Sequence, residues 1–131
     1  MPCKKVAVIE DDADIRNTIC AALGAEGYDT LGFENGKVAL ERLKDEKGTC
    51  LVLLDLMMPV MSGWDFLRAR DAFDHVVLAL PVIIVSAIAD NRLAQDTLKE
   101  PNVMGYMKKP IDLEILLKLV ERYCGPAPAS S

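Results

Sequence analysis

Residues 52–59 read VLLDLMMP and place one carboxylate, Asp55, in an otherwise apolar stretch. An unpaired carboxylate is costly to bury, so its position needs a physical reason. If an apolar strand ends at Leu54, Asp55 lies at the carboxyl edge of a sheet and not in its interior. The stretch therefore predicts a buried strand that is followed at once by a polar site.

Other short apolar runs predict further strands that are buried on both faces. Such runs lie at 6–9, 51–54, 82–85 and 103–107, and a weaker pattern at 28–33 indicates an edge strand. Helical spacing of apolar residues predicts five intervening helices, one after Asp12 or Asp14 and the others at 36–46, 63–70, 90–99 and 112–123. Strict alternation of strand and helix predicts a doubly wound α/β domain with a parallel sheet.

The size and charge of the chain limit its class. Its 131 residues fit one domain with a sizeable core, and its 15 basic residues are scattered among 20 acidic ones. A scattered distribution of cations disfavours direct binding to nucleic acid or to an anionic membrane. The longest charge-free run, 76–89, is too short to cross a bilayer and is broken by Pro81. We therefore expect a soluble, cytoplasmic protein.

The spacing of the four cysteines is not typical of a metal site or of a disulfide-rich fold. Cys3, Cys20, Cys50 and Cys124 show no CxxC spacing and no His-rich neighbourhood. This spacing predicts neither a zinc site nor a disulfide framework, and it favours a reducing cytoplasm. Cys20 and Cys50 are expected to be buried thiols.

Polar residues follow the predicted strands where each strand ends. In an open α/β sheet, ligands bind beyond the carboxyl ends of the strands, so these side chains should converge on one rim. They are Glu10, Asp11 and Asp12 after the first strand, Asp55 after the third, Ser86 after the fourth, and Lys108, Lys109 and Pro110 after the fifth.

The acidic residues of this rim predict a divalent cation. Two carboxylates about 4 Å apart repel by roughly 4 kcal/mol at an effective dielectric constant near 20, so Glu10, Asp11 and Asp55 need protonation or a cation. Oxygen ligands without His or Cys favour Mg²⁺, which commonly also binds a phosphate oxygen. The rim is thus suited to phosphate chemistry, with Asp55 as a nucleophile.

Several segments carry a family resemblance when they are taken together. They are VIEDDADIR (8–16), ENGKVALERL (34–43), VLLDLMMPVMSGWDFL (52–67), LPVIIVSA (80–87) and GYMKKP (105–110). The acidic pair, the Asp with Pro four and Gly eight residues later, the Ser-Ala pair and the Lys-Pro pair all fall at predicted strand ends. In this order they resemble the receiver (CheY-like) domain of two-component response regulators over residues 4–123.

The resemblance implies a role for each matching residue. Asp55 would be the phosphoacceptor, with Ser86 and Lys109 contacting the phosphoryl group. The Mg²⁺ ligands would be Asp11 directly, Glu10 through water, Asp55 and the backbone carbonyl of Met57. Tyr106 matches a switch aromatic that turns inward on phosphorylation. The Lys-Pro pair, commonly a cis peptide in this family, selects Lys109 over the solvated Lys108, and Asp12 would be a helix cap or a spectator.

The resemblance also implies a fold and partners. The fold would be flavodoxin-like, (βα)5, with strand order 2-1-3-4-5, over residues 1–124; residues 125–131 would form a flexible tail or the start of a linker. The phosphodonor would be a histidine kinase or a histidine phosphotransfer protein. Output would pass to a protein or domain not identifiable from sequence, through the fourth and fifth predicted helices, at 90–99 and 112–123, and the last predicted strand, at 103–107. A phosphorylation-dependent homodimer could also form through this face. Ile115 and Leu119 suggest an apolar docking face on the last helix.

Two other functions remain open from the sequence. One is a receiver-like interaction module that is not phosphorylated, which usually lacks an active-site residue. The other is a Mg²⁺-dependent aspartyl phosphohydrolase, which would need an Asp at position 57, where this chain has Met. Met57 and Ile88 depart from the polar residues that often flank the family's phosphorylation site. His75, the single histidine, is expected to be a surface residue without a donor role.

Overall fold

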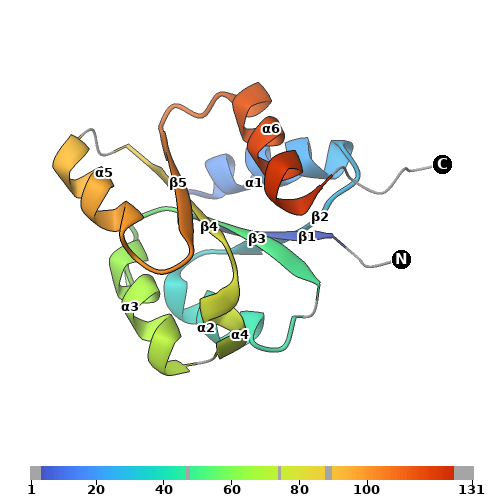
Figure 1. Cartoon of the computed structure of the whole chain (residues 1–131). Helices are drawn as coiled ribbons and strands as arrows, with labels where there is room; N and C mark the ends of the chain where they lie inside the picture. Colours follow the sequence, from blue (N-terminus) through green and yellow to red (C-terminus); the bar gives the residue numbers. More distant parts are fainter. Residues whose placement is uncertain (1–3, 47, 74, 88–89, 126–131) are drawn as a thin grey trace.

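Five parallel strands form one sheet in the order β2-β1-β3-β4-β5 (Figure 1). They are β1 Lys5–Ile9, β2 Asp29–Phe33, β3 Thr49–Leu54, β4 Val82–Ser86 and β5 Val103–Lys108. The computed structural model describes residues 4–46, 48–73, 75–87 and 90–125, so the predicted tail at 126–131 and Ile88 lie outside it. The strand order confirms the predicted doubly wound α/β class.

The helices follow the predicted positions with one addition. They are α1 Ala13–Ala25, α2 Gly36–Leu43, α3 Gly63–Phe73, α4 His75–Ala79, α5 Asn91–Leu98 and α6 Leu113–Cys124. The short helix α4 was not predicted, because five residues span too few turns to show a helical period. The placement of the His75 side chain is not described, so its expected surface position stays a prediction.

The sheet is buried between two layers of helices. Helices α1 and α6 cover one face, and α2, α3 and α4 cover the other (Figure 1). Successive residues of a strand point to opposite faces, so Val6 and Val8 join the core under α1 and α6 while Ala7 and Ile9 join the core on the other face. This double coverage explains why the strands appear in the sequence as continuous apolar runs.

Short polar caps fix the start of several helices near the rim. The Asp12 carboxylate accepts hydrogen bonds from the backbone N–H groups of Asp14 and Ile15, so Asp12 and not Asp14 caps α1. Asp90 and Asp112 cap α5 and α6 in the same way. The capped helices α1, α5 and α6 therefore begin directly after the loops that follow β1, β4 and β5.

The expectation of unpaired cysteines is wrong for two of them. Cys50, near the start of β3, and Cys124, the last residue of α6, form a disulfide with Cα atoms 5.4 Å apart. The sequence offered no sign of this pair, because residues separated by 74 positions meet only through the tertiary fold. Cys20 is a free, half-buried thiol on α1.

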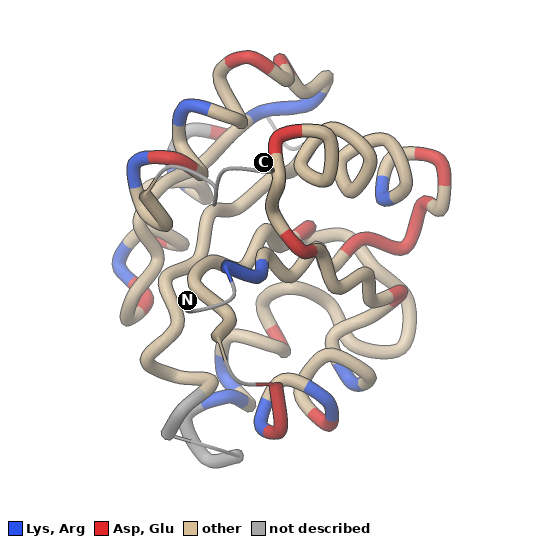
Figure 2. The backbone as a smooth tube through the Cα atoms, turned by 90° about the vertical axis from the view of Figure 1, so that its right-hand side faces the viewer, with Lys and Arg blue, Asp and Glu red and all other residues tan. Residues whose placement is uncertain are grey.

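Charged residues are spread over many elements. Lys and Arg occur on several separate parts of the backbone, among Asp and Glu (Figure 2). Among the described residues, no helix is both long and apolar enough to cross a membrane.

One loop residue is held in a strained backbone conformation. Val60, between β3 and α3, has φ of 68° and a side chain that is 78% exposed. This left-handed region is unfavourable for a β-branched residue, whereas Asn adopts it readily.

We expect Val60→Asn to raise the free energy of unfolding by about 1 kcal/mol, because it relieves strain and removes few buried contacts. Urea unfolding of the variant and the wild type measures the difference. Val60→Thr is the matched control, since it stays β-branched and should give no gain. An equal gain in both variants would contradict strain as the cause.

Candidate functional site

The site forms where β1 and β3 lie side by side. Ile9 pairs with Leu54 at the last position of this ladder, and the Asp55 N–H donates to the Ile9 carbonyl over 3.0 Å. The residues that follow the two strands, Glu10 and Asp55, therefore emerge next to each other. The lone carboxylate of VLLDLMMP lies at the strand's end, as the sequence indicated.

Three carboxylates converge at this rim. One oxygen from each of Glu10, Asp11 and Asp55 lies within 4.8 Å of the others. Glu10 and Asp55 are only 3% and 4% exposed, whereas Asp11 is exposed. This set of oxygen donors, without His or Cys, matches the ligand preference of a hard divalent ion.

One lysine reaches into the carboxylate cluster. The Lys109 Nζ lies 2.5 Å from Glu10 Oε1 and 3.5 Å from Asp55 Oδ2. The Lys109 N–H also donates to the Ser86 carbonyl, and the Lys109–Pro110 peptide is cis. The neighbouring Lys108 is exposed, so Lys109 is the lysine of this pair that lies next to the carboxylates.

Glu10 and Asp11 hold their protons more tightly than usual. Burial, followed by contact with Asp55, raises the pKa of Glu10 even though Lys109 opposes the shift. Partial burial and then the Glu10 carboxylate raise the pKa of Asp11. Raised pKa values at neighbouring acids mean that their negative charges are incompletely compensated by the protein.

The pKa of Lys109 is raised as well, which for a lysine favours the charged form. Burial lowers its pKa, but pairing with Glu10 and the charge of Asp55 outweigh burial, and its pKa is raised above the usual value. The ammonium group therefore stays charged beside Asp55 at neutral pH. A single ammonium cannot balance three carboxylates, which leaves the site suited to a further cation.

The remaining predicted residues lie around this cluster. Ser86 ends β4 and is fully buried. Tyr106 pairs with Ile84 across β4 and β5, and since Ser86 is two residues beyond Ile84, all three side chains project to one face of the sheet. Tyr106 is half-buried and packs against the core on that face. This arrangement is compatible with coupling between Ser86 and Tyr106.

The loop after Asp55 is held close to it. The Met57 N–H donates to Asp55 Oδ1 over 3.3 Å, while the Met57 side chain is 61% exposed. A Cβ at Gly63 would lie 2.5 Å from the Asp55 carbonyl oxygen, so only glycine fits where α3 starts. The metal-ligand role of the Met57 carbonyl stays a prediction.

One positioning contact was not predicted. The Arg16 guanidinium on α1 donates over 2.7 Å to the Glu10 carbonyl, and its stem packs against Gly32 of the neighbouring strand. Arg16 thereby helps to fix the backbone of the acidic pair. The sequence does not single out Arg16, because most arginines on helices are exposed to solvent without a specific role.

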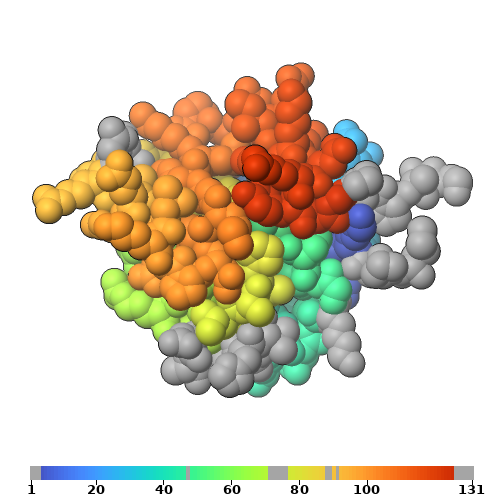
Figure 3. Space-filling model, in the orientation of Figure 1, coloured from blue at the N-terminus to red at the C-terminus, as the bar shows by residue number. Residues whose placement is uncertain are grey.

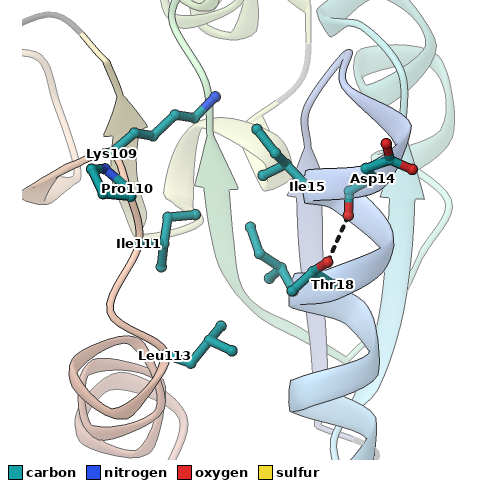
Figure 4. A pocket seen from close by; sticks show the side chains of 8 residues that line it. Asp14, Ile15, Thr18, Lys109, Pro110, Ile111 and Leu113 are labelled. Atoms are coloured by element: carbon teal, nitrogen blue, oxygen red, sulfur yellow. Dashed lines mark hydrogen bonds between the residues drawn. The ribbon is translucent and has the colours of Figure 1, made fainter.

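An apolar groove opens beside the site. It has a volume of about 300 Å³ and lies between α1 and the segment that follows β5. Figure 4 shows Ile15 and Thr18 on the α1 side, facing Pro110, Ile111 and Leu113, with Lys109 at one end. A molecule that approaches the carboxylates from this direction would contact the groove.

The fold and this rim define a signalling domain of the receiver class. The response regulator receiver domain family matches residues 6–121. The match spans most of the chain, so the chain belongs to this family of two-component signalling domains.

Individual relatives agree with this assignment. The chain is 34% identical to the transcriptional regulatory protein CrdR of Helicobacter pylori, over 95% of this chain and 57% of CrdR. It is 31% identical to the response regulator receiver protein CpdR of Brucella abortus, over 91% of this chain and 95% of CpdR. A solved response regulator receiver protein from Pseudomonas putida superposes with a TM-score of 0.84 at 31% identity, over 93% of this chain and 98% of that one. The chain thus spans nearly all of one relative and little more than half of another.

The raised pKa values of Glu10 and Asp11 predict that, without a bound metal ion, the carboxylate cluster lowers the free energy of unfolding as pH rises. Above the ordinary pKa of Asp11, 3.8, the folded protein binds more protons than the unfolded chain, so the contribution of this group to stability is lost as pH rises through its raised pKa. Asp11→Asn should therefore be more stable than the wild type at pH 7, by up to about 1 kcal/mol because solvent screens this exposed group, and not at pH 3.5.

Chemical unfolding at both pH values in the presence of a chelator measures this difference. Asp45→Asn, an exposed acid in the loop before β3, is the control and should show no such gain. A gain at pH 7 that persists undiminished at pH 3.5 would contradict the raised pKa of Asp11 as its cause.

Proposed function

We propose that this chain is a phosphoacceptor receiver that takes a phosphoryl group onto Asp55 from a histidine kinase or a histidine phosphotransfer protein. The observation that carries the proposal is the position of the Asp55 carboxylate, with Glu10 and Asp11 within 4.8 Å and the Lys109 Nζ 3.5 Å from its Oδ2. These contacts support the proposal, because a carboxylate that can act as a nucleophile, oxygen donors suited to a metal ion and an ammonium group lie at one point of the rim.

The transfer would break the P–N bond of a phosphohistidine and form a P–O bond to an Asp55 carboxylate oxygen, leaving the imidazole as the leaving group. Lys109 is positioned to pair with the phosphoryl oxygens, and the Ser86 hydroxyl to donate to one of them. Mg²⁺, when held by Glu10, Asp11, Asp55 and the Met57 carbonyl, would neutralise charge on the transferring group. A donor that reaches Asp55 would contact the groove between α1 and residues 110–113.

Phosphorylation would then alter the surface formed by α5, β5 and α6. Movement of Ser86 toward the phosphoryl group would vacate space that Tyr106, on the same face of the sheet, could occupy. Figure 3 shows α5, β5 and α6 side by side on one face of the molecule. Leu98, Met104 and Ile115 on these elements are 40%, 45% and 51% exposed, which supports a protein-contact surface there. Leu119 instead packs against the core.

The two alternative functions have less support. An interaction module without phosphorylation would explain neither the complete acidic cluster nor the pairing of Lys109 with it. An aspartyl phosphohydrolase would need an acid two residues after Asp55, and Met57 offers an exposed thioether there. We therefore propose that the domain acts on no substrate beyond its own phosphoryl group. We also propose that it lies in the cytoplasm. Its proposed boundaries are residues 1–124, followed by a tail or linker.

The phosphorylation proposal predicts that Asp55 carries an acid-labile label. With Mg²⁺ and acetyl phosphate, intact-mass measurement should show a gain of one phosphoryl group that disappears on treatment with hydroxylamine. Asp55→Asn should reduce the incorporation at least about 100-fold, since the nucleophile is lost. Asp65→Asn, on the exposed side of α3, is the control and should label normally. Equal labelling of Asp55→Asn and the wild type would refute the proposal.

The contact-surface proposal predicts that charge on this face blocks association. If the phosphorylated protein dimerises, Met104→Lys with Ile115→Lys should weaken the dimer at least about 10-fold, because two exposed apolar contacts are replaced by like charges. Analytical ultracentrifugation with and without phosphodonor measures the effect. Ala21→Lys with Ala25→Lys adds the same charge to exposed positions of α1 and should leave association unchanged. Equal weakening by both pairs would indicate net charge instead of the surface.

A further inference from the structure

We propose that Cys50 and Cys124 are a reversible oxidation site that reacts with disulfides of the glutathione type and fastens the end of α6 to the start of β3. This inference does not depend on phosphorylation. It begins from the geometry of the pair, whose Cα separation of 5.4 Å lies in the range that a disulfide needs without backbone movement.

The local backbone aims Cys50 at its partner. Lys5 pairs with Thr49 and Val6 pairs with Leu51, so Cys50 is the extra residue at an irregularity in the ladder between β1 and β3. Such a bulge redirects a side chain away from the regular strand alternation. The site therefore lies at the amino end of β3, at the opposite end of that strand from Asp55.

Both oxidation states are accommodated by the fold. Cys50 and Cys124 are half-buried, so a small thiol or disulfide can reach them. The Cys50 Sγ lies 3.2 Å from the Lys5 carbonyl oxygen, which can accept a hydrogen bond from the thiol once the pair is reduced. Helix α6 keeps other anchors without the crosslink, because Leu116 and Val120 are fully buried and the Tyr28 hydroxyl donates to the Gly125 carbonyl.

The chemistry is a balanced two-step exchange. The thiolate of one cysteine attacks glutathione disulfide, which forms a mixed disulfide and releases one glutathione. The second cysteine then displaces the remaining glutathione, so two protein thiols become one disulfide and one glutathione disulfide becomes two glutathione molecules.

Oxidation should change stability measurably. The disulfide closes a loop between residues 74 positions apart, which restricts the unfolded chain. Reduction of the full chain should lower the thermal midpoint by about 5 to 15 °C. It should also speed amide exchange in the last turn of α6, where the crosslink is attached.

The decisive experiment equilibrates the full chain in glutathione buffers from fully reduced to fully oxidised, then quenches with acid and alkylates the free thiols. Peptide mass spectrometry should show Cys50 and Cys124 becoming protected together, in one transition that reverses on dilution into reduced glutathione, while Cys20 remains alkylated. Full alkylation of the pair in glutathione disulfide alone would overturn the proposal. Persistence of the crosslink in excess reduced glutathione would overturn its reversibility and thus also the proposal.

Variants separate the crosslink from general effects of reductant. Cys50→Ser with Cys124→Ser should unfold at the same temperature with and without reductant, whereas Cys20→Ser should retain the wild-type difference. Cys124→Ser alone removes only the residue at the helix end and should behave like the double variant. A redox-dependent midpoint that survives in Cys124→Ser would contradict the assignment.

Discussion

The mutual repulsion of three carboxylates at the carboxyl ends of β1 and β3 is the constraint around which this domain is arranged. Glu10 and Asp55 are almost fully buried, and the Lys109 ammonium lies next to both. Such charges persist in a low-dielectric site only if the backbone holds them in place. The parallel pairing of β1 with β3, the Arg16 bond to the Glu10 carbonyl and the close fit of Gly63 under Asp55 all serve to hold them.

The same constraint explains which parts of the site could be predicted from sequence. Strand ends are visible as apolar runs that stop at a polar residue, so the sequence alone locates Asp55 and the acidic pair. Lys109 could be separated from Lys108 through its neighbour Pro110. Arg16 and the Cys50–Cys124 disulfide could not be predicted, because each depends on how close two distant segments lie in the fold. The pattern of apolar and polar residues indicates which side chains are buried and where a strand ends. It does not indicate which distant segments lie next to each other in the fold.

The loop after Asp55 keeps a backbone conformation and exposed apolar side chains that do not favour stability. Val60 occupies a left-handed conformation that suits Asn or Gly, and the apolar side chains of Val60 and Met57 are exposed. Exposed apolar residues on a strained loop do not contribute to the core, and departures from local preference are typical of functional sites. The fold tolerates them because neither of the two hydrophobic cores on the faces of the sheet includes these side chains.

Helix α6 connects the two ends of the domain at which chemistry is proposed. It begins at Leu113, after the segment that carries Lys109, and ends at Cys124 beside the start of β3. A helix held at one end can shift on a sheet more readily than a helix held at both ends, because the covalent crosslink removes displacements of its free end. A signal that moves the start of α6 would therefore meet more resistance in the oxidised protein than in the reduced one. Phosphorylation and thiol oxidation would then act on one element, and the rigidity of that helix would couple them without any direct contact between the two sites.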